Sequence, residues 1–323
     1  MQKKSRLVCN QQPRRKRTSI VVLYLSQGTC PLFRPKGRGM YPSHTINKSA
    51  ILPCMELEIV RSDPAGNITI FVVTPLGNAE RVAAAKALLA DPFLKAEQVG
   101  FALPPRKEGD LWRLEMAGGE FCGNASRSFG LLAAARCGLT GKCTLTIETS
   151  GMTMPMSVHI DTDAQSAEIE IPAPLAETEI EMAGQRLPLY EFEGIAHVIA
   201  ADIQPDEQTA RLIIKKLDEC SRAKGRHLHK AAGVMFFDTQ KCFMRPVVWT
   251  RMMDTLVCES SCGSGSAALG VWAARNTPDA ELDIDLAQPG GTITVRVAKH
   301  GGKIGRLSIA GKVTLGKPLR FGC

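Results

Sequence analysis

The chain has 323 residues, of which 44% are hydrophobic and 22% charged, so its composition is that of a globular protein and excludes a fibrous or disordered one. Its formal charge of +8 arises in residues 1–54, which hold eleven Lys or Arg and no Asp or Glu, while the other residues hold 29 basic and 32 acidic side chains, a net charge of −3. Because aromatic residues make up only 5% of the chain and form no stripe with basic ones, we expect no nucleic-acid binding by the folded body.

Residues 1–54 are predicted to form a basic, disordered leader. Their apolar run at residues 20–25 is much shorter than the about 20 residues of a membrane span, and no clean small-residue cleavage site follows it. We therefore favour an upstream start codon or a disordered arm over a targeting segment, and expect the folded protein to start near Met55. The same features predict a cytoplasmic protein without membrane contact.

After Met55, strand-like alternation of apolar and polar residues is interrupted by a few helical patterns. In chain order we predict a strand at 67–74, a helix at 80–89, a strand at 111–116, a helix at 123–135, strands at 144–149, 157–161 and 167–171, a helix at 206–217, strands at 233–237 and 245–250, a helix at 263–275, and strands at 292–298 and 306–309. This order predicts an α+β fold with two pseudosymmetric lobes, each a curved, mostly antiparallel sheet or barrel around a central helix. We place the N-terminal lobe at residues 55–185 and the C-terminal lobe at residues 186–323.

Two segments 140 positions apart have nearly the same sequence: residues 122–126 read CGNAS and residues 262–266 read CGSGS. An Ala- and Leu-rich helical run follows each segment, which puts Cys122 and Cys262 at helix N-termini. Free backbone N–H groups there stabilise an anion, so we expect a thiol pKa below the ordinary value of about 8.5 and a place for a substrate carboxylate. Two such sites facing each other would let one sulfur remove an α-proton while the other delivers one.

The eleven cysteines are widely scattered and include no C-x2-C pair, and no His lies at zinc-ligand spacing from any of them. We therefore expect no metal site and reduced thiols, most of them in the core. The lysines show no pattern that indicates a Schiff base, so we expect no pyridoxal phosphate or other cofactor. The chemistry would then depend on dry walls, N–H donors and placed thiols.

Five short motifs give the chain its resemblance to a known family: PAGN at residues 64–67, EQVGF at 97–101, MAGGEFCGNA at 116–125, ESSCGSGSA at 259–267 and QPGG at 288–291. With these motifs, residues 55–323 resemble the diaminopimelate epimerase-like family, whose members racemise amino acids without pyridoxal phosphate. Within that family they are most similar to the histidine racemases of staphylopine-type metallophore synthesis.

Diaminopimelate epimerases carry a Glu-Arg pair nine and eight residues before the second cysteine, where this chain has Met253 and Asp254. They also have a substrate-binding Asn where this chain has Ile195. A site for a second carboxylate needs the guanidinium, and Arg251 would replace it only if the loop took another path. Both differences argue against diaminopimelate as the substrate.

The resemblance implies a role for each matching residue. Those roles are acid/base catalysis for Cys122 and Cys262, binding of the substrate α-carboxylate for Gly123, Asn124, Gly263 and Ser264, and contact with the substrate for Asn67 and Gln98. Of three nearby acidic residues, Glu97, Glu120 and Glu259, which would bind an ammonium or imidazole group, we name Glu259 as a substrate-binding residue. His197 is either a packed, hydrogen-bonded histidine or part of the site.

The sequence thus predicts a cofactor-independent amino-acid racemase that converts L-histidine to D-histidine, with a small amino acid as its partner and a homodimer as an open alternative to a monomer. Three other classes stay open: a diaminopimelate epimerase of lysine biosynthesis, a proline-racemase-like dehydratase, and a non-catalytic amino-acid-binding or thiol-redox protein on the same fold.

Overall fold

The computed structural model describes residues 21–22, 56–103, 111–223, 225, 230–251, 254–276 and 278–322. Most of the predicted leader, together with Met55 and Met253, therefore lies outside the described residues. Among the described residues, none of the helices combines the length and the apolar character that crossing a membrane requires.

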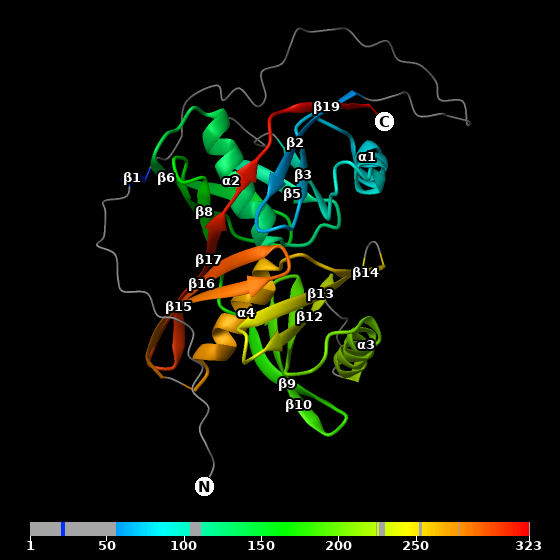
Figure 1. Ribbon diagram of the computed structural model, residues 1–323, viewed down its shortest axis with the longest axis vertical. Coiled ribbons are helices and arrows are strands. Elements are labelled where there is room, and N and C mark those ends of the chain that lie inside the picture. The colour runs from blue at the N-terminus through cyan, green and yellow to red at the C-terminus, as the bar shows by residue number, and fades with distance from the viewer. Residues whose placement is uncertain are drawn as a thin grey trace, which may run out of the picture.

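The fold is α+β, as predicted, and all four predicted helices are present: α1 (Asn78–Ala90), α2 (Gly123–Arg136), α3 (Glu207–Ala223) and α4 (Gly263–Ala274). The strands are β1 (Val21–Val22), β2 (Glu56–Asp63), β3 (Thr69–Val72), β4 (Gln98–Leu103), β5 (Trp112–Met116), β6 (Lys142–Thr149), β7 (Met156–Asp161), β8 (Ser166–Glu170), β9 (Ala176–Met182), β10 (Gln185–Phe192), β11 (Ile195–Ala201), β12 (Ala231–Asp238), β13 (Phe243–Thr250), β14 (Thr255–Cys258), β15 (Ala280–Gln288), β16 (Gly291–His300), β17 (Lys303–Lys312), β18 (Thr314–Leu315) and β19 (Leu319–Gly322). They form one mixed sheet, mostly antiparallel, that passes around both α2 and α4 (Figure 1).

Helices α2 and α4 are buried on nearly all sides, whereas α3 buries a single face through Ala210, Ile213 and Leu217. Strands β6, β7 and β8 pack against α2, and strands β11, β15, β16 and β17 pack against α4. A helix surrounded by strands has no polar face, which explains why both helices consist largely of Gly, Ala, Ser and bulky apolar residues. We call the surroundings of these two helices the α2 half and the α4 half.

The repeated glycine eight positions after each cysteine has the same structural cause in both halves. A Cβ atom on Gly130 would lie 2.7 Å from Val158 Cγ1, and one on Gly270 would lie 2.5 Å from Val295 Cγ1. Both distances are shorter than a normal van der Waals contact. The glycine is therefore repeated because a strand packs very closely against each central helix at this position.

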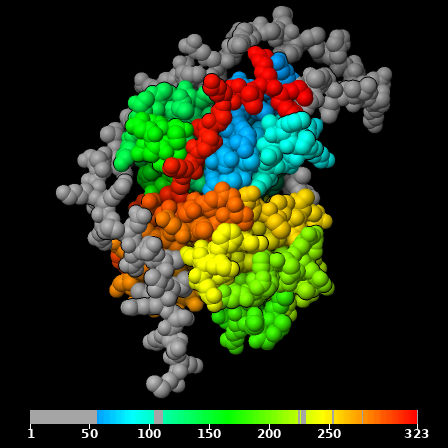
Figure 2. All heavy atoms as spheres, viewed as in Figure 1, coloured from blue at the N-terminus to red at the C-terminus, as the bar shows by residue number. Residues whose placement is uncertain are grey.

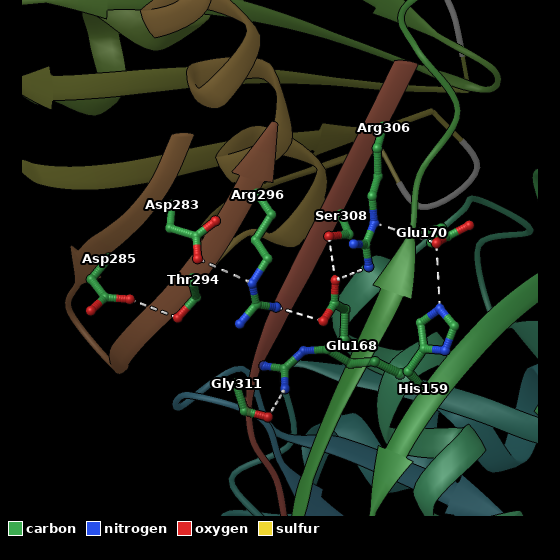
Figure 3. Close-up of polar contacts among 11 residues, drawn as sticks. His159, Glu168, Glu170, Asp283, Asp285, Thr294, Arg296, Arg306, Ser308 and Gly311 are labelled. Carbon is green, nitrogen blue, oxygen red and sulfur yellow. Dashed lines mark hydrogen bonds and ion pairs between the residues drawn. The ribbon is translucent and has the colours of Figure 1, made fainter. Parts of the chain in front are cut away.

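The two halves are joined by β17, which pairs with β16 on one side and with β8 on the other. On this joint, Glu168 of β8 accepts hydrogen bonds from Arg296 Nη1 at 2.5 Å, Arg306 Nη2 at 2.9 Å and Ser308 Oγ at 2.6 Å (Figure 3). Its side chain is only 18% exposed, and the charge-assisted bond from Arg296 is part-buried, whereas Arg306 is 48% exposed. In the space-filling view the two halves meet without an opening on the visible face (Figure 2).

The strand pairing crosses the predicted boundary between residues 185 and 186. That boundary falls within β10, directly after its first residue, and β10 pairs with β9 on one side and with β11 on the other. At the other end of the chain, β18 and β19 return to the α2 half and pair with β2. Strands from the end of the sequence thus complete the half that carries Cys122.

We expect Glu168→Gln to lower the free energy of unfolding by about 1–3 kcal/mol, because three buried or half-buried donors lose their charged acceptor. Urea denaturation followed by circular dichroism measures the change. Glu179→Gln is the matched control, since the Glu179–Arg186 pair is exposed, and it should change stability by less than about 0.5 kcal/mol. Equal effects of the two substitutions would show that Glu168 does not join the halves.

Candidate functional site

The starts of α2 and α4 meet at one small cavity. A Cβ atom on Gly263 would lie 3.3 Å from the Asn124 backbone nitrogen, and Ile309 Cδ1 lies against both Gly123 and Gly263. The cavity is lined by Asn67, Gln98, Glu120, Phe121, Cys122, Gly123, Ile195, Ala231, Val248, Thr250, Glu259, Ser261, Cys262, Gly263 and Ser264. Eight of the nine predicted site residues are therefore brought together, and its free volume of about 30 Å³ holds roughly one water molecule.

Each cysteine caps its helix with the same geometry. Cys122 has φ −125° and ψ 110°, and Cys262 has φ −127° and ψ 116°, both outside the helical region. The Sγ atoms accept hydrogen bonds at 3.4 Å from the backbone N–H groups of Ala125 and Gly265. The sulfur thus occupies the acceptor position that a Ser or Asp side chain normally fills at a helix start.

A chain of polar contacts links the two sulfurs. The Cys122 thiol donates to Gln98 Oε1 at 2.9 Å, and Gln98 Nε2 donates to Glu259 Oε1 at 3.3 Å. The Glu259 carboxyl in turn has a side-chain hydrogen bond with Cys262. Glu259 therefore lies next to both thiols.

The predicted residue Asn124 does not line the cavity but lies directly behind it, fully buried. Its Nδ2 donates to Ser261 Oγ at 3.1 Å and is 3.4 Å from Asn67 Oδ1. Its Oδ1 accepts from Nε of the buried Arg127 at 3.3 Å. The side chain thus fixes the contact between the halves, and carboxylate binding by this residue stays a prediction.

His197 is a fully buried histidine whose Nε2 lies 2.8 Å from Ser264 Oγ, and that hydroxyl lies 3.7 Å from Cys262 Sγ. It reaches the cavity only through Ser264. Gln288 of the QPGG motif was not among the predicted site residues, yet its Oε1 accepts from the Cys262 backbone N–H at 2.8 Å while its Nε2 donates to Ser266 Oγ. Its position in the QPGG motif was the sequence feature that could have identified it as a site residue.

Burial raises the pKa of Cys122 to about 12 and the pKa of Cys262 well above its usual range, and the charge of Glu259 raises both further. Backbone N–H groups at the helix starts act in the opposite direction, but they are outweighed. The predicted lowering of the thiol pKa is therefore wrong for the substrate-free site. Burial also raises the pKa of Glu259, to about 8.

Two residues relevant to diaminopimelate recognition lie away from the cysteines. Arg251 and Asp254 line a separate open groove beside α3, where Asp254 Oδ1 accepts a hydrogen bond from Trp249 Nε1. Ile195 lines the cysteine cavity, as an apolar residue in place of the Asn. Among the described residues, no group of three or more His, Cys, Asp or Glu side chains is placed to hold a metal ion.

Comparisons with known proteins show the family and the fold of this chain. The family described as the histidine racemase CntK N-terminal domain matches residues 56–317. A histidine racemase of Staphylococcus aureus strain Mu50 is 30% identical over 266 residues, covering 80% of this chain and 94% of that protein, and one of Fusobacterium nucleatum is 33% identical over 225 residues, covering 68% and 82%. In fold, the chain is similar to a Bacillus anthracis phenazine biosynthesis protein of the PhzF family, with a TM-score of 0.58 and 16% identity over 84% of this chain and 99% of that one.

We expect Cys122 and Cys262 to react slowly with iodoacetamide at pH 7, because both are buried and their raised pKa values keep them as thiols. Cys258, which is exposed, serves as the internal reference and should be alkylated at least about tenfold faster. Peptide mass spectrometry over a time course measures all three rates in one sample. Faster modification of Cys122 or Cys262 than of Cys258 would contradict a closed, protonated site.

Proposed function

Because this chain belongs to the histidine racemase family, we propose that it interconverts L- and D-histidine at the cavity between α2 and α4, with Cys122 and Cys262 as its two acid/base groups. The observation that carries the proposal is the pair of cysteines, each capping a buried helix, on the wall of one cavity. Isomerisation of an amino acid is the activity, and the two-cysteine step is the mechanism that the site supports best.

The proton balance of the step is simple. One thiolate takes the α-proton and becomes a thiol, and the carbanion then takes a proton from the opposite thiol, which becomes the thiolate. The stereocentre inverts, and the enzyme is left with its charge on the other sulfur. The reverse reaction starts from that state, so no other acid or base is consumed.

The substrate-free site holds both sulfurs as thiols, so one proton must leave before catalysis. Glu259, with a pKa of about 8 and contact with Cys262, is the nearest group to accept it. An incoming α-ammonium group then supplies the positive charge that a buried thiolate lacks. Since the cavity has a volume of only about 30 Å³, it must widen to admit histidine and close around it.

Backbone N–H groups at the two helix starts support carboxylate binding. Gly123 and Gly263 line the cavity next to the two cysteines, and Ser264 adds a hydroxyl group to the lining. Asn67 and Gln98 line the same cavity. This arrangement provides one carboxylate site, and Arg251 lines a different groove, so it does not supply a second one for diaminopimelate.

We further propose that the α2 and α4 halves are two pseudosymmetric lobes, at residues 55–185 and 186–323. Strand pairs connect the two residue ranges where β9 pairs with β10, where β8 pairs with β17, and where β18 and β19 pair with β2. The protein acts in the cytoplasm on a free amino acid, without nucleic acid, membrane or cofactor, and its D-histidine supplies metallophore synthesis. A homodimer is the oligomeric state to test.

We expect Cys122→Ser and Cys262→Ser each to lower the rate of histidine racemisation by about 10²- to 10⁴-fold, because a serine hydroxyl is a far weaker acid than a thiol. Incubation with L-histidine in D2O, followed by proton NMR for loss of the α-proton signal and by chiral chromatography, measures exchange and inversion. Cys258→Ser, at an exposed position, is the matched control and should keep full activity.

The two cysteines give distinguishable outcomes in this assay. Exchange at the wild-type rate in either variant would remove that cysteine from the mechanism. Exchange of lysine-pathway diaminopimelate but not of histidine would favour the epimerase alternative, and no exchange of either would favour a binding or redox protein.

We expect kcat/KM for histidine to rise with pH through about 8, because the proposed proton acceptor Glu259 has a pKa of about 8, whereas the raised pKa values keep the thiols protonated across this range. Glu259→Gln should lower kcat/KM and remove this rise from the profile, since an amide does not accept the thiol proton. The D2O exchange rate at constant ionic strength measures both profiles. Identical profiles for the two proteins would show that Glu259 does not act on the thiols.

A further inference from the structure

Three carboxyl groups lie near the cysteines, and the structure gives each a different set of partners. Glu97 is held by protein donors: Asn67 Nδ2 at 2.9 Å, the Ser260 backbone N–H at 3.1 Å and the Ser260 hydroxyl. It fastens the α2 half to the α4 half and does not line the cavity. Glu97 has little capacity left for a ligand.

Glu259 is connected to both sulfurs. It contacts Cys262 directly and is linked to Cys122 through Gln98. A substrate whose α-carbon sits between those sulfurs carries its ammonium group one bond from that carbon. Glu259 is therefore the carboxyl group for the ammonium.

Glu120 lines the same cavity, but its Oε2 is buried and has no hydrogen-bond partner among the described residues. The carboxyl group folds over Gly118, where a Cβ atom would collide with Oε2. Burial raises its pKa. An unpartnered, buried carboxyl oxygen is costly, and a ligand that supplies a donor removes that cost.

Glu120 shares the lining of this cavity with residues suited to a side-chain ring. Ile195, Ala231 and Val248 are apolar, and Thr250 adds a hydroxyl group. Glu259 is engaged with Gln98 and Cys262, whereas Glu120 Oε2 has no hydrogen-bond partner among the described residues. A donor on the substrate side chain therefore has its available acceptor at Glu120.

We propose that Glu120 accepts a hydrogen bond from the imidazole N–H of histidine and thereby selects this substrate over other amino acids. The inference rests on the proposed function, because it takes histidine as the ligand of this cavity. The three acidic residues then have different roles: Glu97 holds the halves together, Glu259 binds the ammonium group, and Glu120 binds the imidazole ring of the side chain.

Two ligands separate these roles in an equilibrium binding experiment. Imidazolylpropionate, which is histidine without its amino group, keeps the imidazole and the carboxylate. Phenylalanine keeps the ammonium, the carboxylate and a flat ring, but has no ring N–H. Isothermal titration calorimetry of both ligands requires no turnover, so it remains informative even if the two-cysteine mechanism fails.

Glu120→Met keeps the length of the side chain and removes both acceptor oxygens. We expect it to weaken imidazolylpropionate binding about 10- to 100-fold and phenylalanine binding by less than about twofold. Its thermal midpoint should equal or exceed that of the wild type, because an unpartnered acid is replaced by an apolar group. Glu115→Met, at a half-exposed ion pair with Arg81, is the matched control and should change neither affinity.

The opposite results overturn the inference. Weaker binding of phenylalanine alone would assign Glu120 to the ammonium group, and equal weakening of both ligands would assign it to the shape of the cavity. Unchanged binding of imidazolylpropionate would exclude contact with the ring. In the D2O assay, Glu120→Met should raise KM for histidine more than it lowers kcat. A wild-type enzyme that does not exchange the α-proton of histidine would instead contradict the proposed function.

Discussion

Two buried helix N-termini that meet at one point are the constraint on which this structure depends. A helix start leaves backbone N–H groups without intrahelical partners, and burying them requires acceptors. Here the acceptors are the two capping sulfurs and the Gln288 side chain, which takes the N–H of Cys262. The remaining backbone N–H groups at the helix starts face the cavity between the helices. Burial excludes water from this cavity, which favours anion binding at the helix starts. The same burial raises the pKa of both thiols and keeps them protonated.

The sequence predicted the helices well and the strands less completely. All four helices were found: α2 and α4 are long runs of apolar and small residues, and α3 has the apolar spacing of a helix that buries one face. Strands β4, β9, β10, β11 and β15 were not among the predicted elements. Strand β11 is buried along nearly its whole length and pairs in parallel with β12, so its residues do not alternate between apolar and polar. Long-range pairing, such as that of β19 with β2, has no local signal at all.

For the site, the motif resemblance identified most of the residues, but it did not predict their protonation or their hydrogen-bond partners. Eight predicted residues line the cavity, since short motifs fix residue types at each helix start. The thiol pKa was predicted in the wrong direction because the depth of burial cannot be read from the residues flanking Cys122 or Cys262. The different partners of Glu97, Glu120 and Glu259 could not be predicted from their neighbours in sequence. Asn67 lies 30 positions from Glu97, Gln98 lies 161 positions from Glu259, and Oε2 of Glu120 has no hydrogen-bond partner among the described residues.

The return of β18 and β19 to β2 has a consequence for biosynthesis. The strand β19, which pairs with β2 in the half that carries Cys122, is synthesised more than 200 positions after β2. The first half is therefore synthesised with an open sheet edge and acquires this neighbour only after β17 has been made. Folding of the two halves is thus coupled in time, and a nascent chain halted after β17 would expose that edge to aggregation.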